Sequence, residues 1–352
     1  MDALTELLRI VKLDSAIYFN AEMSEPWCLA APRSREIAHW LTNPEHHVII
    51  YHLLWEGTAY AQMRDGEAVP LAPGDVVCFP HGDEHLLGNG VPGGSLLTAG
   101  SRALGAKVDI VLPEMLERNL EVLRLGGGGA RSRFICGFLA CDRDLAQAFL
   151  QGLPELIRVS IKGDETGVWL ENSLKFAVGQ GATRDTGTRA MLAKLSEVLF
   201  AETLRRFARD LPAGHKGWFA SLRDPSVGRA LGLLIKDPGR PWTLAELAQE
   251  SGVSRTVLSE RFRHFLGESP MAYLTRWRLG LGARALASTN QSVAQIAVDV
   301  GYESESAFNR AFKRQYSLPP ARYRRERGRF APGVLGASPR GAEPSGSAAK
   351  PP

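Results

Sequence analysis

One segment of this chain occurs twice near the carboxyl end, and this repeat constrains the fold more than any other feature. The first copy runs from Thr243 to Leu274 and the second from Ser292 to Arg324. With one inserted residue, seven positions of similar chemistry align: Leu247, Ala248, Gly252, Leu258, Phe262, Pro270 and Tyr273 with Ile296, Ala297, Gly301, Phe308, Phe312, Pro320 and Tyr323. We therefore expect the chain to build one small unit twice.

Each copy has the pattern of two helices joined by a tight turn. A short apolar stripe at helical spacing comes first, formed by Leu244, Leu247 and Ala248 and by Val293, Ile296 and Ala297. A glycine then allows the turn, and Ser254 or Ser304 can cap the next helix. That helix has an apolar face made by Val257, Leu258, Phe262 and Phe265, or by Ala307, Phe308, Phe312 and Tyr316. Its other face is polar, which is the form that enters the DNA major groove.

The alternative is a pair of helical hairpins whose charges only face solvent, and the duplication favours DNA binding over it. The residues placed to contact DNA are Arg255, Thr256, Ser259, Arg263, Ser304, Ser306, Asn309, Arg310 and Lys313. Arginine favours guanine and asparagine favours adenine, so Arg310 and Asn309 are candidates for reading bases. Glu260 on the first copy would accept from cytosine or repel phosphate. Arg322, Arg324, Arg325 and Lys313 are expected to contact phosphate, which adds affinity without sequence choice. The segment from Met271 to Leu286 is predicted to be a stiff helical connector.

This segment resembles the DNA-binding domain of the AraC/XylS family of bacterial transcription regulators. The match covers Trp242 to Arg325, and the family signature reads IAVDVGYESESAFNRAFKRQYSLPPARYR in the second copy. The resemblance implies double-stranded DNA and RNA polymerase as partners, and activation of transcription. One departure is Ser317, where the family usually has glycine, so a local change in the exit of the second recognition helix is expected.

Charge is divided unevenly along the chain. From Gly214 to Phe330 there are 19 Lys and Arg against 10 Asp and Glu, whereas residues 1–213 hold 21 against 27. The basic half is the one with the repeat, as neutralisation of DNA phosphates requires. There is no run of 18 apolar residues and no signal-peptide pattern, so we expect a cytoplasmic protein without membrane contact.

The amino-terminal half predicts a small β-barrel or sandwich. Short apolar runs broken by Gly, Pro and Asp extend from Ile37 to about Thr98, with a hairpin turn expected at Asp65 and Gly66. Gly74, Pro80, Gly82, His85 and Asn89 have the spacing of the second sequence motif of the cupin barrels, which this part resembles. The expected fold class is α+β: a cupin-like barrel with a helical dimerisation region, followed by an all-α double helix-turn-helix domain.

In cupin enzymes the histidine of this motif binds a catalytic metal, together with an earlier HxH and a glutamate. Here the earlier positions fall near Asn43, Glu45 or His46, and Ile50, so the ligand set is incomplete. His46, His47, His52 and His85 could still assemble a site. We predict no metal, cofactor or catalytic residue, and keep a metal-dependent enzyme with an appended DNA-binding region as the alternative. The candidate sensor residues for a small molecule or an oxidant are His85, His52, Cys78 and Cys28.

Helical patterns follow the barrel, over residues 145–159, 168–178 and Thr188 to Arg209. The last has an apolar face wide enough to pack on the barrel and also on a second subunit, so we expect a homodimer. The alternative is a helix that packs only within its own chain. The four cysteines have no metal or CxxC spacing and are expected to be reduced and buried. The predicted domains are a sensor and dimerisation domain (1–210), a linker with a lead-in helix (211–241), the DNA-binding domain (242–327) and a disordered tail (328–352). Resemblance to AraC regulators with a cupin-type sensor then spans residues 2–325.

Overall fold

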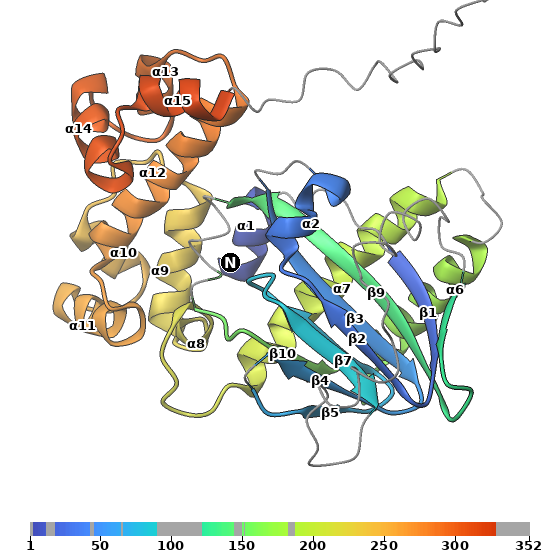
Figure 1. Ribbon diagram of the computed structural model, residues 1–352. Coiled ribbons are helices and arrows are strands. Elements are labelled where there is room, and N and C mark those ends of the chain that lie inside the picture. Colours follow the sequence, from blue (N-terminus) through green and yellow to red (C-terminus); the bar gives the residue numbers. More distant parts are fainter. Residues whose placement is uncertain are drawn as a thin grey trace, which may run out of the picture.

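The computed structural model describes residues 3–11, 18–42, 46–64, 66–89, 122–143, 150, 152–181 and 187–328. Asn43, Glu45, Asp65, the segment from Gly94 to Gly100 and the tail from residue 329 onward lie outside these described residues. Figure 1 shows a β-rich half and a helical half side by side, with the first helix, α1 (Ala3–Ile10), between them. No described helix is both long enough and apolar enough to cross a membrane.

The β-rich half contains two sheets, which confirms the predicted fold class. The six-stranded sheet has the order β10-β6-β3-β9-β1-β8, and the four-stranded sheet has the order β2-β7-β4-β5. The strands are β1 (Tyr18–Ser24), β2 (Trp27–Ala31), β3 (His46–Glu56), β4 (Ala59–Met63), β5 (Val69–Leu71), β6 (Asp75–Phe79), β7 (His85–Asn89), β8 (Val122–Gly126), β9 (Arg131–Asp142) and β10 (Ile157–Ser160). All recorded pairs are antiparallel except β1 with β8, which is parallel.

Strand alternation divides the side chains of this half between two cores. Successive side chains of a strand point to opposite faces of the sheet. On β3, Leu54 joins Phe79 and Phe134 in the cluster between the sheets. Ile49 and Leu53 instead join the cluster formed with the helices that cover the six-stranded sheet. The strand is therefore buried on both faces, which explains its almost unbroken apolar sequence.

Two predictions of local structure in this half were wrong. Ile37 belongs to helix α2 (Ser34–Leu41), because Ile37, Ala38 and Leu41 share one helical face that packs on β3. The end of the predicted helical segment at 145–159 is strand β10, because buried Ile157 and Val159 alternate with exposed neighbours and pair with β6. A helix-type pattern and a short strand are difficult to separate over so few residues.

Two long helices cover the outer face of the six-stranded sheet. They are α6 (Glu165–Gly181) and α7 (Thr188–Asp210), and Figure 1 shows them behind the strands. Leu192, Leu199 and Leu204 of α7 are fully buried against the domain. The hydroxyl groups of Tyr51 on β3 and Ser196 on α7 lie 2.6 Å apart, which fixes the helix to the sheet.

The helical half contains the repeat. Its helices are α8 (Trp218–Ser221), α9 (Pro225–Lys236), α10 (Leu244–Glu250), α11 (Arg255–Leu266), α12 (Pro270–Ser288), α13 (Val293–Asp299), α14 (Glu305–Tyr316) and α15 (Pro320–Gly328). One hydrophobic cluster runs from α1 through α9 into the first unit, where it includes Leu258 and Phe262. The second unit has a separate cluster around Phe308 and Phe312.

Candidate nucleic-acid interface

The first unit is formed by α10, α11 and the start of α12, and a side chain caps each helix. Thr243 accepts from the backbone N–H of Glu246, whose carboxylate accepts from Thr243 in return. Ser254 caps α11 by accepting from the N–H of Val257 at 3.3 Å. Ser269 caps α12 in the same way. These caps satisfy N–H groups that a helix cannot bond internally, so the short helices are fixed by local sequence.

The second unit, formed by α13, α14 and α15, repeats this arrangement, but it has a serine where the first unit has a glycine after the recognition helix. Ser292 caps α13 and Ser304 caps α14. At the end of α14, Ser317 adopts the left-handed conformation with φ of 59°, as Gly267 does at the end of α11 with φ of 73°. The two helices therefore end in the same backbone conformation, and the difference at the exit is limited to a hydrogen bond: the N–H of Gly267 donates to the carbonyl of Arg263, and no equivalent bond of Ser317 is found among the described residues. A serine instead takes the conformation that glycine prefers, at a cost of roughly 1 kcal/mol.

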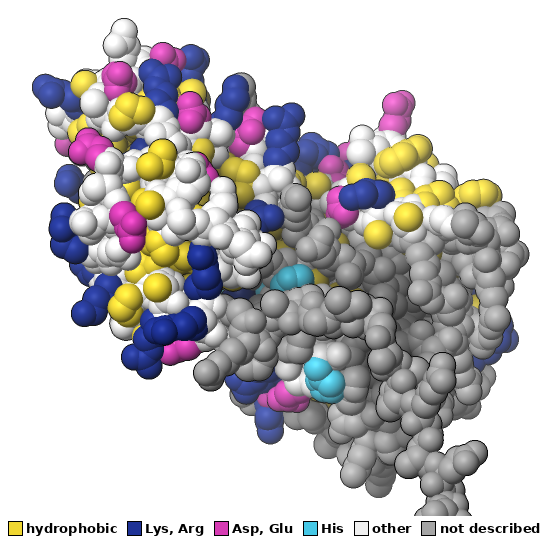
Figure 2. Space-filling model, turned by 90° about the horizontal axis from the view of Figure 1, so that it is seen from above, with side chains coloured by type: hydrophobic (Ala, Val, Ile, Leu, Met, Phe, Trp, Pro, Cys, Tyr) yellow, Lys and Arg dark blue, Asp and Glu magenta, His cyan; other side chains and the backbone are white. Residues whose placement is uncertain are grey.

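The polar faces of α11 and α14 are both at the surface. Arg255, Thr256 and Arg263 of the first unit are exposed, as are Ser306, Arg310 and Lys313 of the second. Ser259 and Asn309 are half-buried. Figure 1 places α11 and α14 on the same outer edge of the molecule, towards opposite ends of α12, and Figure 2 shows Lys and Arg side chains along that edge. A long polyanion could contact both helices from this side.

Three predicted contact residues have partners within the protein. The hydroxyl of Ser304 is the α14 cap and accepts from the N–H of Ala307 at 3.2 Å. The Asn309 amide lies 3.5 Å from Glu305 on the same helix, which is a weak contact. Arg324, considered for phosphate contact, donates to the carbonyls of Leu286 and Gln291. Arg324 therefore stabilises the carboxyl-terminal end of α12 and the turn that follows it.

The repeat offset of 50 residues brings opposite charges to equivalent places on the two recognition helices. Glu260 of α11 corresponds to Arg310 of α14, and both side chains are exposed. Among the described residues, neither has an ion-pair partner within 4 Å. The exposed face of α14 is thus more positive than that of α11 at this equivalent position.

The first unit is also attached to the lead-in helix α9. Arg261 of α11 forms an ion pair of 3.1 Å with Asp224, which caps α9 through the N–H groups of Ser226 and Val227. Burial alone would raise the pKa of Asp224, but its hydrogen bonds and the nearby Arg261 lower the pKa overall. The indole of Trp218 on α8 donates to the hydroxyl of Tyr273, which is the repeat counterpart of Tyr323. Sequence reasoning did not predict these contacts.

Two of the four candidate sensor residues meet between the sheets. The Nε2 atoms of His52 and His85 lie 3.1 Å apart, and both side chains are buried. Because Nδ1 of His85 must donate to the carbonyl of Asp83, its Nε2 accepts from His52. Nδ1 of His52 is then a buried acceptor without a recorded partner. Burial lowers the pKa of His85 to about 4, and burial with the neighbouring His85 lowers that of His52, so both are neutral at pH 7.

The candidate cysteines lie elsewhere. Cys78 is on the face of β6 that joins the helix-covered core, and Cys28 packs with Leu86 on the other face of β2. Burial raises the pKa of both thiols, which disfavours the reactive thiolate. Cys136 stands directly opposite His52 on β9, between the sheets, and was not among the predicted residues. All four cysteines are reduced thiols and are buried, as predicted.

The histidines considered for a metal site belong to two separate places. His46 and His47 open β3 at one end of the sandwich and line a surface pocket, whereas His52 and His85 lie between the sheets. No group of three or more histidine, cysteine or acidic side chains among the described residues is arranged to hold a metal ion. The described residues therefore do not assemble the ligand set that the enzyme alternative would use.

Comparison with known families assigns both halves of the chain. A cupin family model matches residues 2–209, and a helix-turn-helix domain model matches residues 247–326. The chain belongs to the AraC family of transcription regulators, with an amino-terminal cupin domain. In this AraC-type regulator, the two matches fall on the β-rich half with α6 and α7 and on the two helical units.

Curated relatives of this AraC-type regulator are also named as regulators of transcription. The regulator AlkR of Acinetobacter baylyi is 27% identical and aligns over 93% of this chain and 100% of its own length. RclR of Escherichia coli, named as an RCS-specific transcriptional activator, is 26% identical over 94% of this chain and 100% of its own. An AraC-like regulator of Streptomyces lividans is 42% identical over 182 residues, which are 51% of this chain and 59% of that protein.

Proposed function

We propose that the chain is a sequence-specific DNA-binding transcription activator in which α14, and to a lesser degree α11, reads base edges. The observation that carries this proposal is the pair of capped, exposed recognition helices with Arg310, Ser306 and Asn309 on one face. The connector α12 has 19 residues, so it is about 28 Å long at 1.5 Å per residue. That length suits two helices entering major grooves about one turn of DNA apart. Because the partner is chromosomal DNA, we expect a cytoplasmic protein.

Selection from a random DNA library tests this proposal. We expect the wild-type chain to enrich one motif, and Arg310→Ala to lose the preference at a few positions of that motif. Arg325→Ala is the matched control, because Arg325 is exposed beyond the recognition helix and would contact phosphate, so all sequences should weaken alike. If the wild-type chain enriches no motif, or if Arg310→Ala enriches the same motif, the proposal is wrong.

We also propose that the chain forms a homodimer through α6 and α7. Most of the predicted apolar face of α7 packs inside its own domain, but Val168, Trp169 and Phe176 of α6 are between 52% and 63% exposed. Met191 and Val198 of α7 are exposed as well. Figure 2 shows hydrophobic side chains gathered on the side of the molecule where these helices lie. Large exposed apolar side chains on adjacent helices are typical of a subunit interface.

Analytical ultracentrifugation tests the dimer. Trp169→Asp combined with Phe176→Asp should shift the chain to monomer. Val298→Asp is the control, because Val298 is 61% exposed but lies on α13, and it should leave the mass unchanged. A monomeric wild-type chain, or a double variant that remains a dimer, would contradict this interface.

Finally, we propose that the cupin domain binds an effector and that the DNA-bound chain contacts RNA polymerase. The buried thiols, with their raised pKa values, favour a small-molecule effector over a cysteine that senses oxidants. The continuous hydrophobic cluster from the cupin domain through α9 to the first unit supports coupling of the two halves. Transcription in vitro with purified RNA polymerase checks the second part, because an activator should raise transcript from a promoter that carries its site. Unchanged transcription would contradict it.

A further inference from the structure

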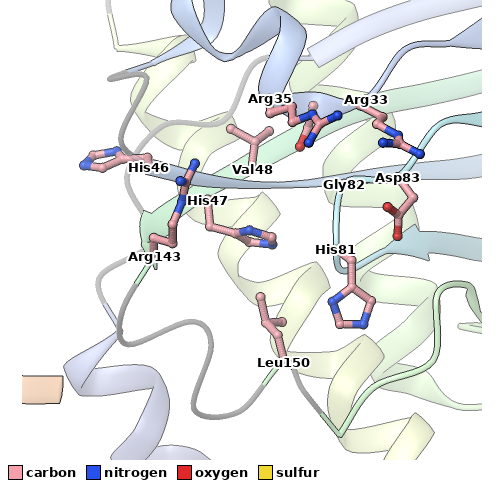
Figure 3. A pocket seen from close by; sticks show the side chains of 11 residues that line it. Arg33, Arg35, His46, His47, Val48, His81, Gly82, Asp83, Arg143 and Leu150 are labelled. Carbon is pink, nitrogen blue, oxygen red and sulfur yellow. The ribbon is translucent and has the colours of Figure 1, made fainter. Parts of the chain in front are cut away.

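A pocket lies outside the two sheets, at the end of the sandwich where β3 begins and β9 ends. Its volume is about 470 Å³, within the range of small-molecule sites. The wall comes from the start of α2, the start of β3, the turn between β6 and β7, Arg143 after β9, and Leu150. Figure 3 shows His47, His81 and Leu150 around the central space, while the ring of His46 points away from it.

The pocket is built on fixed backbone. Gly82, with φ of 67°, lies so close to α2 that an added Cβ would be 1.9 Å from Oγ of Ser34 and 2.6 Å from the carbonyl oxygen of Val48. The N–H of Ser34 donates to the carbonyl of Gly82 at 2.8 Å. These contacts hold the β6–β7 turn against the first turn of α2. The side chains on both segments are therefore positioned before any ligand arrives.

Positive charge dominates the wall. Arg33, Arg35 and Arg143 line the pocket, and none of them has a carboxylate within 4 Å among the described residues. Asp83 is the one carboxylate that the described lining contains. A guanidinium group binds carboxylate and phosphate through paired N–H donors.

The rest of the wall restricts the ligand further. His47 and His81 donate from Nε2 to the carbonyls of Pro80 and Leu153, at 2.6 and 3.0 Å, so both rings have fixed orientations. Leu150 supplies apolar surface. Leu150 belongs to the same buried cluster as Val227 of α9, which leads into the DNA-binding half. The DNA-binding half also contacts the amino-terminal helix α1 directly, because Arg284 of α12 donates to the carbonyl of Ile10 at 2.7 Å.

From these observations we infer that this pocket is the effector site and that its ligand is a small organic anion carrying a carboxylate or a phosphate group. Arg35 and Arg143 hold the anionic group, and Leu150 contacts its apolar part. Occupancy changes the packing of Leu150, which is transmitted through the shared cluster to α9. This inference rests on the proposed function, because an effector can regulate transcription only if the chain binds DNA.

Isothermal titration calorimetry on the full chain tests binding without DNA. The probes are phenylacetate, inorganic phosphate and phenylacetamide, the neutral match of the first. We expect at least one of the two anions to bind at concentrations up to about 10 mM and the amide to bind at least tenfold more weakly. Arg35→Gln combined with Arg143→Gln should lower the anion affinity at least tenfold, whereas Arg124→Gln, on a distant exposed strand, should not.

Three outcomes overturn the inference. The first is that neither anion binds, and the second is that the double variant binds as well as wild type. The third is that His85→Phe, rather than the arginine changes, abolishes binding, which would place the ligand between the sheets. DNA affinity is then measured with and without the bound anion, and we expect a change of roughly fivefold or more. An unchanged affinity overturns the effector role, whereas loss of DNA binding by the ligand-free chain would sink the proposed function instead.

Discussion

The two helix-turn-helix units share a local design but differ in their surroundings. Both have serine caps, a turn glycine and a recognition helix buried through two large apolar residues. The first unit packs into the cluster that reaches the cupin domain and is tied to α9 by the Arg261–Asp224 ion pair. The second has a cluster of its own. Local sequence thus determines the shape of each unit, and the neighbouring helices determine whether the unit is connected to the cupin domain.

The two recognition helices also differ in charge. Glu260 of the first unit stands where the second has Arg310. A carboxylate near phosphate weakens binding, whereas an arginine can donate two hydrogen bonds to guanine. We infer that the second unit reads most of the sequence, and that the first reads less of it, adds contact area and transmits the state of the cupin domain.

The largest expected effect separates the two cores. Phe262→Ala and Phe312→Ala each remove a fully buried ring at equivalent positions and should each cost about 3–5 kcal/mol of stability. Hydrogen exchange measured by mass spectrometry should then differ: Phe312→Ala should speed exchange only in α13 to α15 and in the second half of α12, which contributes Leu279, Ala283 and Leu286 to the same cluster. Phe262→Ala should instead speed exchange in the first unit and also in α8, α9 and α1, because these helices share the cluster of Phe262. Identical exchange patterns for the two variants would show that the units are not separately anchored.

The next effect concerns DNA. Arg310→Ala should lower the preference for the cognate site by about 1–3 kcal/mol. Glu260→Ala should instead raise affinity for all sequences a few-fold, because it removes a negative charge near the phosphates. Binding is measured by fluorescence anisotropy on cognate and scrambled DNA at two salt concentrations. An equal loss of specificity from both variants would contradict the division of roles.

A smaller effect isolates the ion pair that anchors the first unit. Asp224→Asn keeps a helix-capping side chain but removes the charge facing Arg261, and should cost about 0.5–1 kcal/mol at pH 7. Because folding lowers the pKa of Asp224, its contribution is present above the unfolded pKa of about 4 and is lost as pH falls through the folded value. Thermal melts of wild type and variant should therefore converge on acidification. A constant difference between pH 7 and about pH 3 would argue against this role of the pair.

The smallest effect is a gain. Ser317→Gly should stabilise the second unit by about 0.5 kcal/mol, because relief of the left-handed conformation outweighs the entropy that glycine loses. The matched change Gly267→Ser in the first unit should destabilise by a similar amount. Urea denaturation measures both. A destabilised Ser317→Gly variant would mean that the serine side chain stabilises the unit by more than its left-handed backbone costs.

The helical half was largely predictable from the sequence because its determinants are local. The caps at Ser254 and Ser304, the turn glycines and the apolar spacing all lie within a few residues of the helices that they define. Sequence alone did not predict that Ser317 adopts the same geometry as Gly267. Nor did it predict the partners of Arg324 and Arg261, because these depend on how separate helices pack.

The cupin half was less predictable because its contacts are distant in sequence. Strands β1 and β2 were not anticipated, and β1 pairs with β9 more than 100 residues away. The meeting of His52 with His85, and their separation from His46 and His47, depend on which face of β3 each side chain occupies and how β3 lies against β7. Spacing along the chain suggested four histidines, but only the paired sheets divide them into a buried pair and a pocket wall.

Hydroxyl-radical footprinting of the chain on its selected site tests the central claim most directly. Two recognition helices on one edge, joined by α12, should protect two regions on one face of the duplex, centred about 10 base pairs apart. Arg310→Ala should weaken protection in one of the two regions and leave the other. A single protected region, or protection on opposite faces of the DNA, would contradict the account.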